Sequence, residues 1–243
     1  MLFRRLIFAA VALGALIGPV FGVSQQFTTV PIILAAEHFE RFAAHQATHH
    51  ADTHWAPSDG LERTAFTVIA DVCVVVGFAL LLLVAMSVAG AAGDAPMGAG
   101  VGVLWGLAAF AVVFLAPALG LAPEVPGTQA APLADRQLWW LVTALVAAAS
   151  LALLVFAPGW KKLPALVLLP LPYLFGAPEI SGPLFAGHSP AKIPRLEELR
   201  QQFVWVTAAT NLALWVALGA ACGWTMKRWI WAQTRARAPS TTQ

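Results

Sequence analysis

Apolar residues fill six long stretches of this sequence, and polar residues lie mainly between them. The stretches are residues 6–23, 65–90, 98–122, 138–157, 163–177 and 203–226. A straight helix needs about 20 apolar residues to cross a bilayer, and within lipid a helix satisfies its own backbone hydrogen bonds. The pattern therefore predicts an all-α, polytopic membrane protein with about six transmembrane segments.

The fifth stretch is shorter than the others and is interrupted by prolines. Its 15 residues would reach only about 22 Å as a helix. Pro164, Pro170 and Pro172 fall within it, and proline removes a helical hydrogen bond. The stretch either crosses the membrane as a broken segment or enters and returns, so five is the alternative number of crossings.

Charged residues are distributed unequally between the segments that join the stretches. With Arg4 and Arg5 in the cytoplasm, six crossings place Asp94 there as the one acid, against ten acidic and six basic residues in the outer loops. The cytoplasmic basic residues are then Arg4, Arg5, Lys161, Lys162, Lys227, Arg228, Arg235 and Arg237. Because cytoplasmic segments favour Lys and Arg, we expect six crossings, with both termini cytoplasmic, in a bacterial inner membrane.

The first stretch has the basic start of a signal peptide, but its 18 apolar residues exceed the usual length of about 7–15. We therefore expect an uncleaved helix. One membrane domain would cover residues 1–232, with an outer histidine-rich loop at 37–63, followed by a basic and polar cytoplasmic tail at 233–243.

Composition supports this interpretation. Charged residues make up 11% of the chain, against about 25% in soluble domains. The net charge of +2 provides no basic surface for nucleic acid. Cys73 and Cys222 lie in apolar stretches, so no disulfide is expected. Glycines spaced by four residues predict close helix packing; they are Gly14, Gly18 and Gly22, Gly102 and Gly106, and Gly219 and Gly223.

The first outer loop contains most of the histidines. His38, His45, His49, His50 and His54 fall within 17 residues. Steps of seven and four residues would place the first three on one helix face, and Glu37 lies beside them. Neutral imidazole binds divalent transition metals, and carboxylates can complete the coordination shell. These residues are candidate metal ligands; the alternative is a polar loop that happens to be rich in histidine.

Asp71 is the one acidic residue inside an apolar stretch. A charge there is costly and is usually functional or paired. Asp71 is therefore a further candidate for passing a metal ion or proton inward. Alternatively, it reaches the outer interface or pairs with Arg63. In the last stretch, Asn211 could add an oxygen ligand or form hydrogen bonds between helices.

No catalytic or nucleotide-binding motif accompanies these residues. The sequence lacks both a glycine-rich loop followed by Lys and Ser or Thr and the two-histidine zinc-protease pattern. No nucleophile with an aligned base is visible. We therefore expect neither an enzyme nor a resident cofactor, and energy for transport would come from a gradient, from a partner or from trapping of the ion after entry.

Several short sequence motifs, spread along nearly the whole chain, resemble one family, the probable cobalt transporter subunit CbtA. They are Gln25-Gln26, residues 30–37 (VPIILAAE), Arg63-Thr64, 77–81 (GFALL), 105–107 (WGL), 116–121 (APALGL), 123–127 (PEVPG), 134–140 (ADRQLWW), 176–178 (GAP) and 203–219. The most specific is the succession from Trp105 to Trp140. Ala122 stands where the family commonly has proline, and Tyr173 where it commonly has histidine, which puts a metal path near the fifth stretch in doubt.

The resemblance implies a membrane component of cobalt uptake that is linked to cobalamin synthesis. It also implies a second, small single-span subunit of the same system, with its own histidine cluster. The polar residues that fall within these family-like motifs are Glu37, Glu124, Arg136 and Asn211. Nitrogen and oxygen ligands also accept Ni²⁺ and Zn²⁺, so the assignment of Co²⁺ comes from the resemblance. Lipid is an expected partner, and the protein could also form a homo-oligomer.

Two function classes follow from these observations. The first is a transporter subunit that captures metal at the histidine-rich loop and passes it across the bundle. The second is a non-transporting metal sensor, or a scaffold for another permease. Uptake that depends on Asp71 would separate them. A membrane enzyme would require metal-dependent hydrolysis at the histidine-rich loop.

Overall fold

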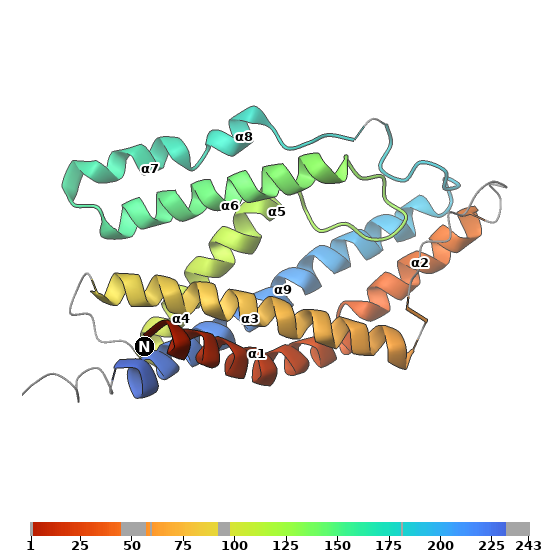
Figure 1. Ribbon diagram of the computed structural model, residues 1–243. Coiled ribbons are helices and arrows are strands. Elements are labelled where there is room, and N and C mark those ends of the chain that lie inside the picture. The colour runs from red at the N-terminus through yellow and green to blue at the C-terminus, as the bar shows by residue number, and fades with distance from the viewer. Residues whose placement is uncertain (1, 45–56, 59, 92–97, 181, 232–243) are drawn as a thin grey trace, which may run out of the picture. The chain divides into compact units, whose positions relative to one another are not determined.

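The computed structural model describes residues 2–44, 57, 58, 60–91, 98–180 and 182–231 (Figure 1). Every regular element in these ranges is a helix, which confirms the all-α prediction. The chain forms two compact units. Unit 1 contains Met1–Gln26, Trp55–Ala109 and Leu212–Gln243, and unit 2 contains Phe27–His54 and Phe110–Asn211.

Unit 1 is built from long apolar helices. They are α1 (Leu2–Phe27), α3 (Leu61–Ala91), α4 (Ala99–Phe110), the second part of α9 (Ile193–Thr225) and the π-helical turn η3 (Met226–Trp231). Gly14 and Gly18 of α1 lie directly against Val76 and Val72 of α3, with no space for a Cβ atom. The glycines spaced by four residues therefore bring two helix backbones into contact, and the predicted close packing is confirmed.

A second glycine contact in unit 1 joins α4 to α9. A Cβ atom on Gly102 would overlap the carbonyl oxygen of Gly219, and one on Gly106 would overlap that of Trp215. The same region of α9 contributes the fully buried Leu218 and Cys222. Cys73 is exposed on α3, and both cysteines are free.

Unit 2 contains the remaining helical elements. They are α2 (Val30–Ala44), the π-helical turn η1 (Ala111–Leu115), α5 (Ala116–Gly120), α6 (Leu133–Phe156), the 3₁₀ turn η2 (Gly159–Lys162), α7 (Leu163–Leu168), α8 (Leu171–Phe175) and the first part of α9. Helix α6 packs against η1, α5, η2, α7 and α8. It is the longest helix wholly inside the unit and organises the rest of it.

Five helices in the described ranges are long and apolar enough to cross a bilayer. They are α1, α3, α4 continued through η1 and α5, α6, and α9 continued through η3. This number matches the alternative count of five. The α9 span, Ile193–Ile230, has 38 residues. At about 1.5 Å per residue it is nearly twice as long as the bilayer core is thick, so its charged first turns extend beyond the lipid.

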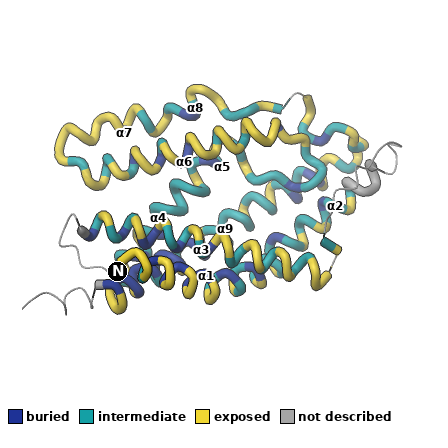
Figure 2. The backbone as a smooth tube through the Cα atoms, in the orientation of Figure 1, coloured by how far each residue is buried: buried dark blue, intermediate teal, exposed yellow. Residues whose placement is uncertain are grey.

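The fifth apolar stretch forms no single spanning helix. Prolines stand at the first turn of α7, at the N-cap of α8 and inside α8, and they divide the stretch into short pieces. These pieces run back beside α6, and most of their residues are exposed (Figures 1 and 2). The prediction of a short, proline-broken segment is confirmed.

The broken segment ends where α6 begins. The backbone N–H of Gln129, before α6, donates to the carbonyl oxygen of Leu184, after α8, at 2.8 Å. Nε2 of His188 lies 3.2 Å from the carbonyl oxygen of Gly127. Helix α6 therefore leads away from this end of unit 2, and η2, α7 and α8 lead back to it.

Candidate functional site

Helix α2 carries the first two candidate ligands, Glu37 and His38. Thr29 immediately precedes the helix, and its carbonyl oxygen accepts hydrogen bonds from the N–H groups of Ile32 and Ile33 at 3.1 Å. Its fully buried Ala36 belongs to an apolar cluster with Val125, Leu199, Ile32, Ala35, Phe39 and Phe203. Because successive residues of a helix point about 100° apart, this packing leaves Glu37 half-buried and His38 exposed.

Glu37 and His38 both interact with other groups of the chain. The ring of His38 stands edge-on to Phe39, with centroids 6.2 Å apart. The other histidines of the cluster, His45, His49, His50 and His54, lie outside the described residues. In the ranges that the structure describes, no group of three His, Cys, Asp or Glu residues is placed to hold a metal ion. The histidine-rich metal site therefore stays a prediction.

Asp71 lies half-buried on the face of α3 that packs against α1. The side-chain amide of Gln25 donates a hydrogen bond to its Oδ2 atom at 2.9 Å. Gly22 stands beside the same oxygen, and a Cβ atom there would approach it to 2.9 Å. The small residue gives the carboxylate room, and the amide stabilises it. Asp71 therefore has a hydrogen-bond partner in Gln25, a different residue from the Arg63 that the sequence suggested.

A second polar contact continues this seam between α1 and α3. The Thr64 hydroxyl donates to Oε1 of Gln26 at 3.4 Å, and Thr67 donates to the carbonyl oxygen of Arg63. Thr64, Thr67 and Asp71 recur at three and four residues, so they lie on one face of α3. The seam thus offers amide, hydroxyl and carboxylate oxygens in the same part of unit 1.

Glu124 and Arg136 form an ion pair in unit 2. Nη1 of Arg136 lies 2.5 Å from Oε2 of Glu124, and both side chains are 30% exposed. The pair joins the loop before α6 to the first turns of that helix. The charges of these two residues, which both lie in the family-like motifs, therefore neutralise each other. In the structure, the ion pair positions the loop.

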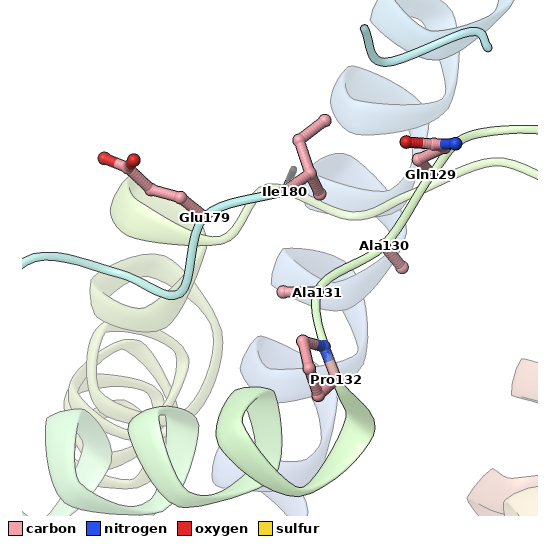
Figure 3. A pocket seen from close by; sticks show the side chains of 6 residues that line it. All are labelled: Gln129, Ala130, Ala131, Pro132, Glu179 and Ile180. Carbon is pink, nitrogen blue, oxygen red and sulfur yellow. The ribbon is translucent and has the colours of Figure 1, made fainter. Parts of the chain in front are cut away.

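A hollow of about 390 Å³ lies at the N-terminal end of α6 (Figure 3). It is lined by Gln129, Ala130, Ala131, Pro132, Glu179 and Ile180. Figure 3 shows Gln129 and Glu179 on opposite sides of it, with the Glu179 carboxylate directed away from the Gln129 amide. The hollow opens between the two loops that the Gln129–Leu184 hydrogen bond joins.

Asn211 has a local role in the structure. Its side-chain amide donates to the carbonyl oxygen of Thr207, one turn earlier, at 3.0 Å. Thr210 donates to the carbonyl oxygen of Val206 at 2.5 Å. These bonds stay within α9, so neither of the roles considered for Asn211, an oxygen ligand or a bond between helices, is seen in this contact.

Sequence reasoning selected Asp71 but missed its partner. Gln25 follows Gly22 by three residues, so it continues the glycine face of α1, and that spacing was the signal available. The pairing of Glu124 with Arg136 joins a loop to a helix, and no helical spacing in the sequence indicates it. Thr143, which is 1% exposed on α6, had no distinguishing pattern.

The spanning helices, together with a hydrogen-bonded carboxylate inside one pair of them, define a polytopic helical membrane protein with a polar seam in its bundle. The chain belongs to the family of probable cobalt transporter subunits (CbtA), whose model matches residues 3–227. This match confirms the family resemblance drawn from the sequence. No curated protein and no solved structure matches the chain.

Proposed function

We propose that this protein takes up Co²⁺, capturing the ion at an outer face rich in His and acidic residues and passing it across the helix bundle. Membership of the cobalt transporter subunit family supports the cargo. The observation that carries the pathway is the Asp71 carboxylate, which Gln25 holds between two spanning helices. An acidic group in such a position is usually retained for function, and carboxylate oxygen is a ligand that Co²⁺ accepts.

The capture face would be formed by α2 and the loop that follows it. Glu37 and His38 are presented on α2, and His45, His49, His50 and His54 come next in the sequence. An array of weak sites suits passage because divalent ions must exchange ligands to move on. Glu40 and Asp52 lie among these histidines and could complete the coordination.

Six traverses with both termini in the cytoplasm agree with the chain path in unit 2. The loop before α6 is joined to the loop after α8, so the broken segment would serve as the return traverse. The basic residues Lys161 and Lys162 then lie on the cytoplasmic side with Arg4 and Arg5, as the positive-inside rule requires.

The protein would act without catalytic activity of its own, together with the small single-span partner of the same system. The family name describes a subunit, which implies at least one partner. A histidine cluster on that partner could pass ions to the one on this chain. The energy source would be an ion gradient or the partner.

Uptake of radioactive Co²⁺ by cells that make the protein, with and without the single-span partner, tests this function. One variant changes the five clustered histidines to alanine, and a matched control changes His188, whose ring contacts the Gly127 carbonyl. We expect uptake above background that the cluster variant loses and the control keeps. Ni²⁺ and Zn²⁺ are added as competitors, because the same ligands accept them. Background uptake by an inserted, partnered protein would instead support a metal sensor or a scaffold for another permease.

A further inference from the structure

Three polar atoms without hydrogen-bond partners lie along one face of α6. They are Nε of Arg136, Nε1 of Trp139 and Oγ1 of Thr143, all buried and without a partner in the described part of the chain. Steps of three and four residues place them in line along the helix. They make up three of the six such side-chain atoms found in the described residues, so they are concentrated on this face.

The groups around these atoms are already engaged. Nη1 of Arg136 binds Glu124, which leaves Nε of the same guanidinium unpaired. The ring of Trp139 lies against Gly120 and stands edge-on to Tyr173, with centroids 6.2 Å apart. The Tyr173 hydroxyl donates to the carbonyl oxygen of Ala116 at 2.7 Å.

The same face continues as an apolar surface in the middle of α6. Ala144 and Ala147 are buried there, and the Ser150 hydroxyl bonds to the carbonyl oxygen of Val146 at 2.8 Å. Helices α5 and α8 pack against α6, and their buried residues Pro117 and Pro172 have no N–H to offer. Thr143 is 1% exposed, and its hydroxyl has no hydrogen-bond partner in the described part of the chain.

The chemistry of the three atoms restricts what can satisfy them. The Nε–H of Arg136 and the Nε1–H of Trp139 can only donate, whereas the hydroxyl of Thr143 both donates and accepts. A bare divalent cation is disfavoured next to two N–H donors. A neutral acceptor is sufficient, because Glu124 already balances the charge of Arg136. Buried polar groups that lack a protein partner are commonly satisfied by internal water.

A hollow lies close to the N-terminal end of α6. Pro132 lines the hollow described above, and its carbonyl oxygen accepts the backbone N–H of Arg136 at 3.1 Å. One helical turn thus separates Pro132, which lines the hollow, from Arg136, the first residue with an unpaired atom. We infer that a file of water molecules runs along this face of α6, from the hollow past Arg136 and Trp139 to Thr143. It gives solvent access to the interior of unit 2 and does not depend on the identity of the cargo.

Cysteine accessibility in the full-length protein, reconstituted in lipid without metal, tests this water file. Cys73 and Cys222 are first replaced by alanine, and Thr143→Cys is compared with Leu141→Cys, at a neighbouring position of α6 that is 49% exposed. The probe is 2-aminoethyl methanethiosulfonate. It reacts with the thiolate, so a hydrated cysteine should react about tenfold faster or more than one facing lipid. Gln129→Cys, in the hollow, shows that the reagent reaches the protein.

The inference predicts fast labelling at Thr143→Cys and slow labelling at Leu141→Cys. Equal, slow labelling at both, with Gln129→Cys labelled, would overturn it. A second variant, Thr143→Val, keeps the shape and removes the hydroxyl, and is measured by thermal unfolding. A hydroxyl bound to water predicts a lower Tm, whereas a dry, unpaired hydroxyl predicts a higher one. Neither readout uses cobalt, so failure of the proposed transport would leave this test intact.

Discussion

At the scale of single residues, the contact between Gln25 and Asp71 explains how a carboxylate is kept inside an apolar helix. The amide donates at 2.9 Å, and Gly22 leaves room for the oxygen it faces. The sequence was sufficient to select Asp71, because a lone acid in an apolar stretch is conspicuous. It could not identify Gln25, since the contact depends on how α1 and α3 pack.

Replacing Asp71 with asparagine should reduce cobalt uptake while leaving the fold intact. Asparagine has the same shape and can still accept the hydrogen bond from Gln25, but it lacks the negative charge that would attract the cation. We expect the rate of uptake to fall about tenfold or more, which corresponds to about 1.4 kcal/mol in activation free energy. Initial rates of radioactive cobalt uptake measure this. Asp135→Asn, which removes an exposed acid at the start of α6, is the matched control, and an equal fall in both variants would refute a specific role.

The ion pair between Glu124 and Arg136 should contribute only modestly to stability. Both side chains are 30% exposed, so solvent screens their attraction. A double-mutant cycle with Glu124→Gln and Arg136→Gln should give a coupling energy of about 1 kcal/mol or less. Thermal unfolding in detergent provides the values. A coupling several times larger would mean that the pair is more deeply desolvated than its exposure indicates.

At the scale of helices, hydrophobic length predicted most of the elements. The stretches at 6–23, 65–90, 98–122, 138–157 and 203–226 each became part of a spanning helix. The prolines of the fifth stretch correctly predicted its interruption. The sequence did not reveal the π-helical turns η1 and η3, because an extra residue per turn changes packing without changing apolar content.

Adding even a methyl group at the glycine contact between α4 and α9 should destabilise the protein. A Cβ atom on Gly102 would overlap a backbone carbonyl oxygen of α9, and backbone cannot rotate aside as a side chain can. We expect Gly102→Ala to lower the free energy of unfolding by about 1–3 kcal/mol.

Gly77→Ala is the control for this prediction, since a Cβ atom there meets nothing within 4 Å. It should leave stability unchanged or raise it by up to about 1 kcal/mol, because alanine favours the helix. Thermal unfolding of both variants in detergent measures the difference. Equal stabilities would mean that α4 and α9 are not in backbone contact.

At the scale of the whole molecule, the path of the chain follows from charge and from one pair of loops. Lys161 and Lys162 lie at the turn between α6 and α7, far along the chain from the joined loops at Gln129 and Leu184. The sequence alone left five and six crossings open. The bond between the loops could not be foreseen from it, because it connects residues that are distant in the chain.

Six traverses predict that Gln129 and Lys161 lie on opposite sides of the membrane. In a background without Cys73 and Cys222, a membrane-impermeant thiol reagent added to intact cells should label Gln129→Cys and leave Lys161→Cys unlabelled. Permeabilised cells should label both. Labelling of Lys161→Cys in intact cells would contradict the proposed orientation.

The most direct test of the central claim is cobalt flux through the purified protein. The protein is reconstituted with its single-span partner into liposomes that contain a fluorophore quenched by Co²⁺, and wild type is compared with Asp71→Asn. Transport predicts quenching when Co²⁺ is added outside under an imposed ion gradient, with a rate that falls about tenfold in the variant. Quenching no faster than in protein-free liposomes, under every gradient and with both proteins inserted, would contradict the claim that this protein conducts cobalt.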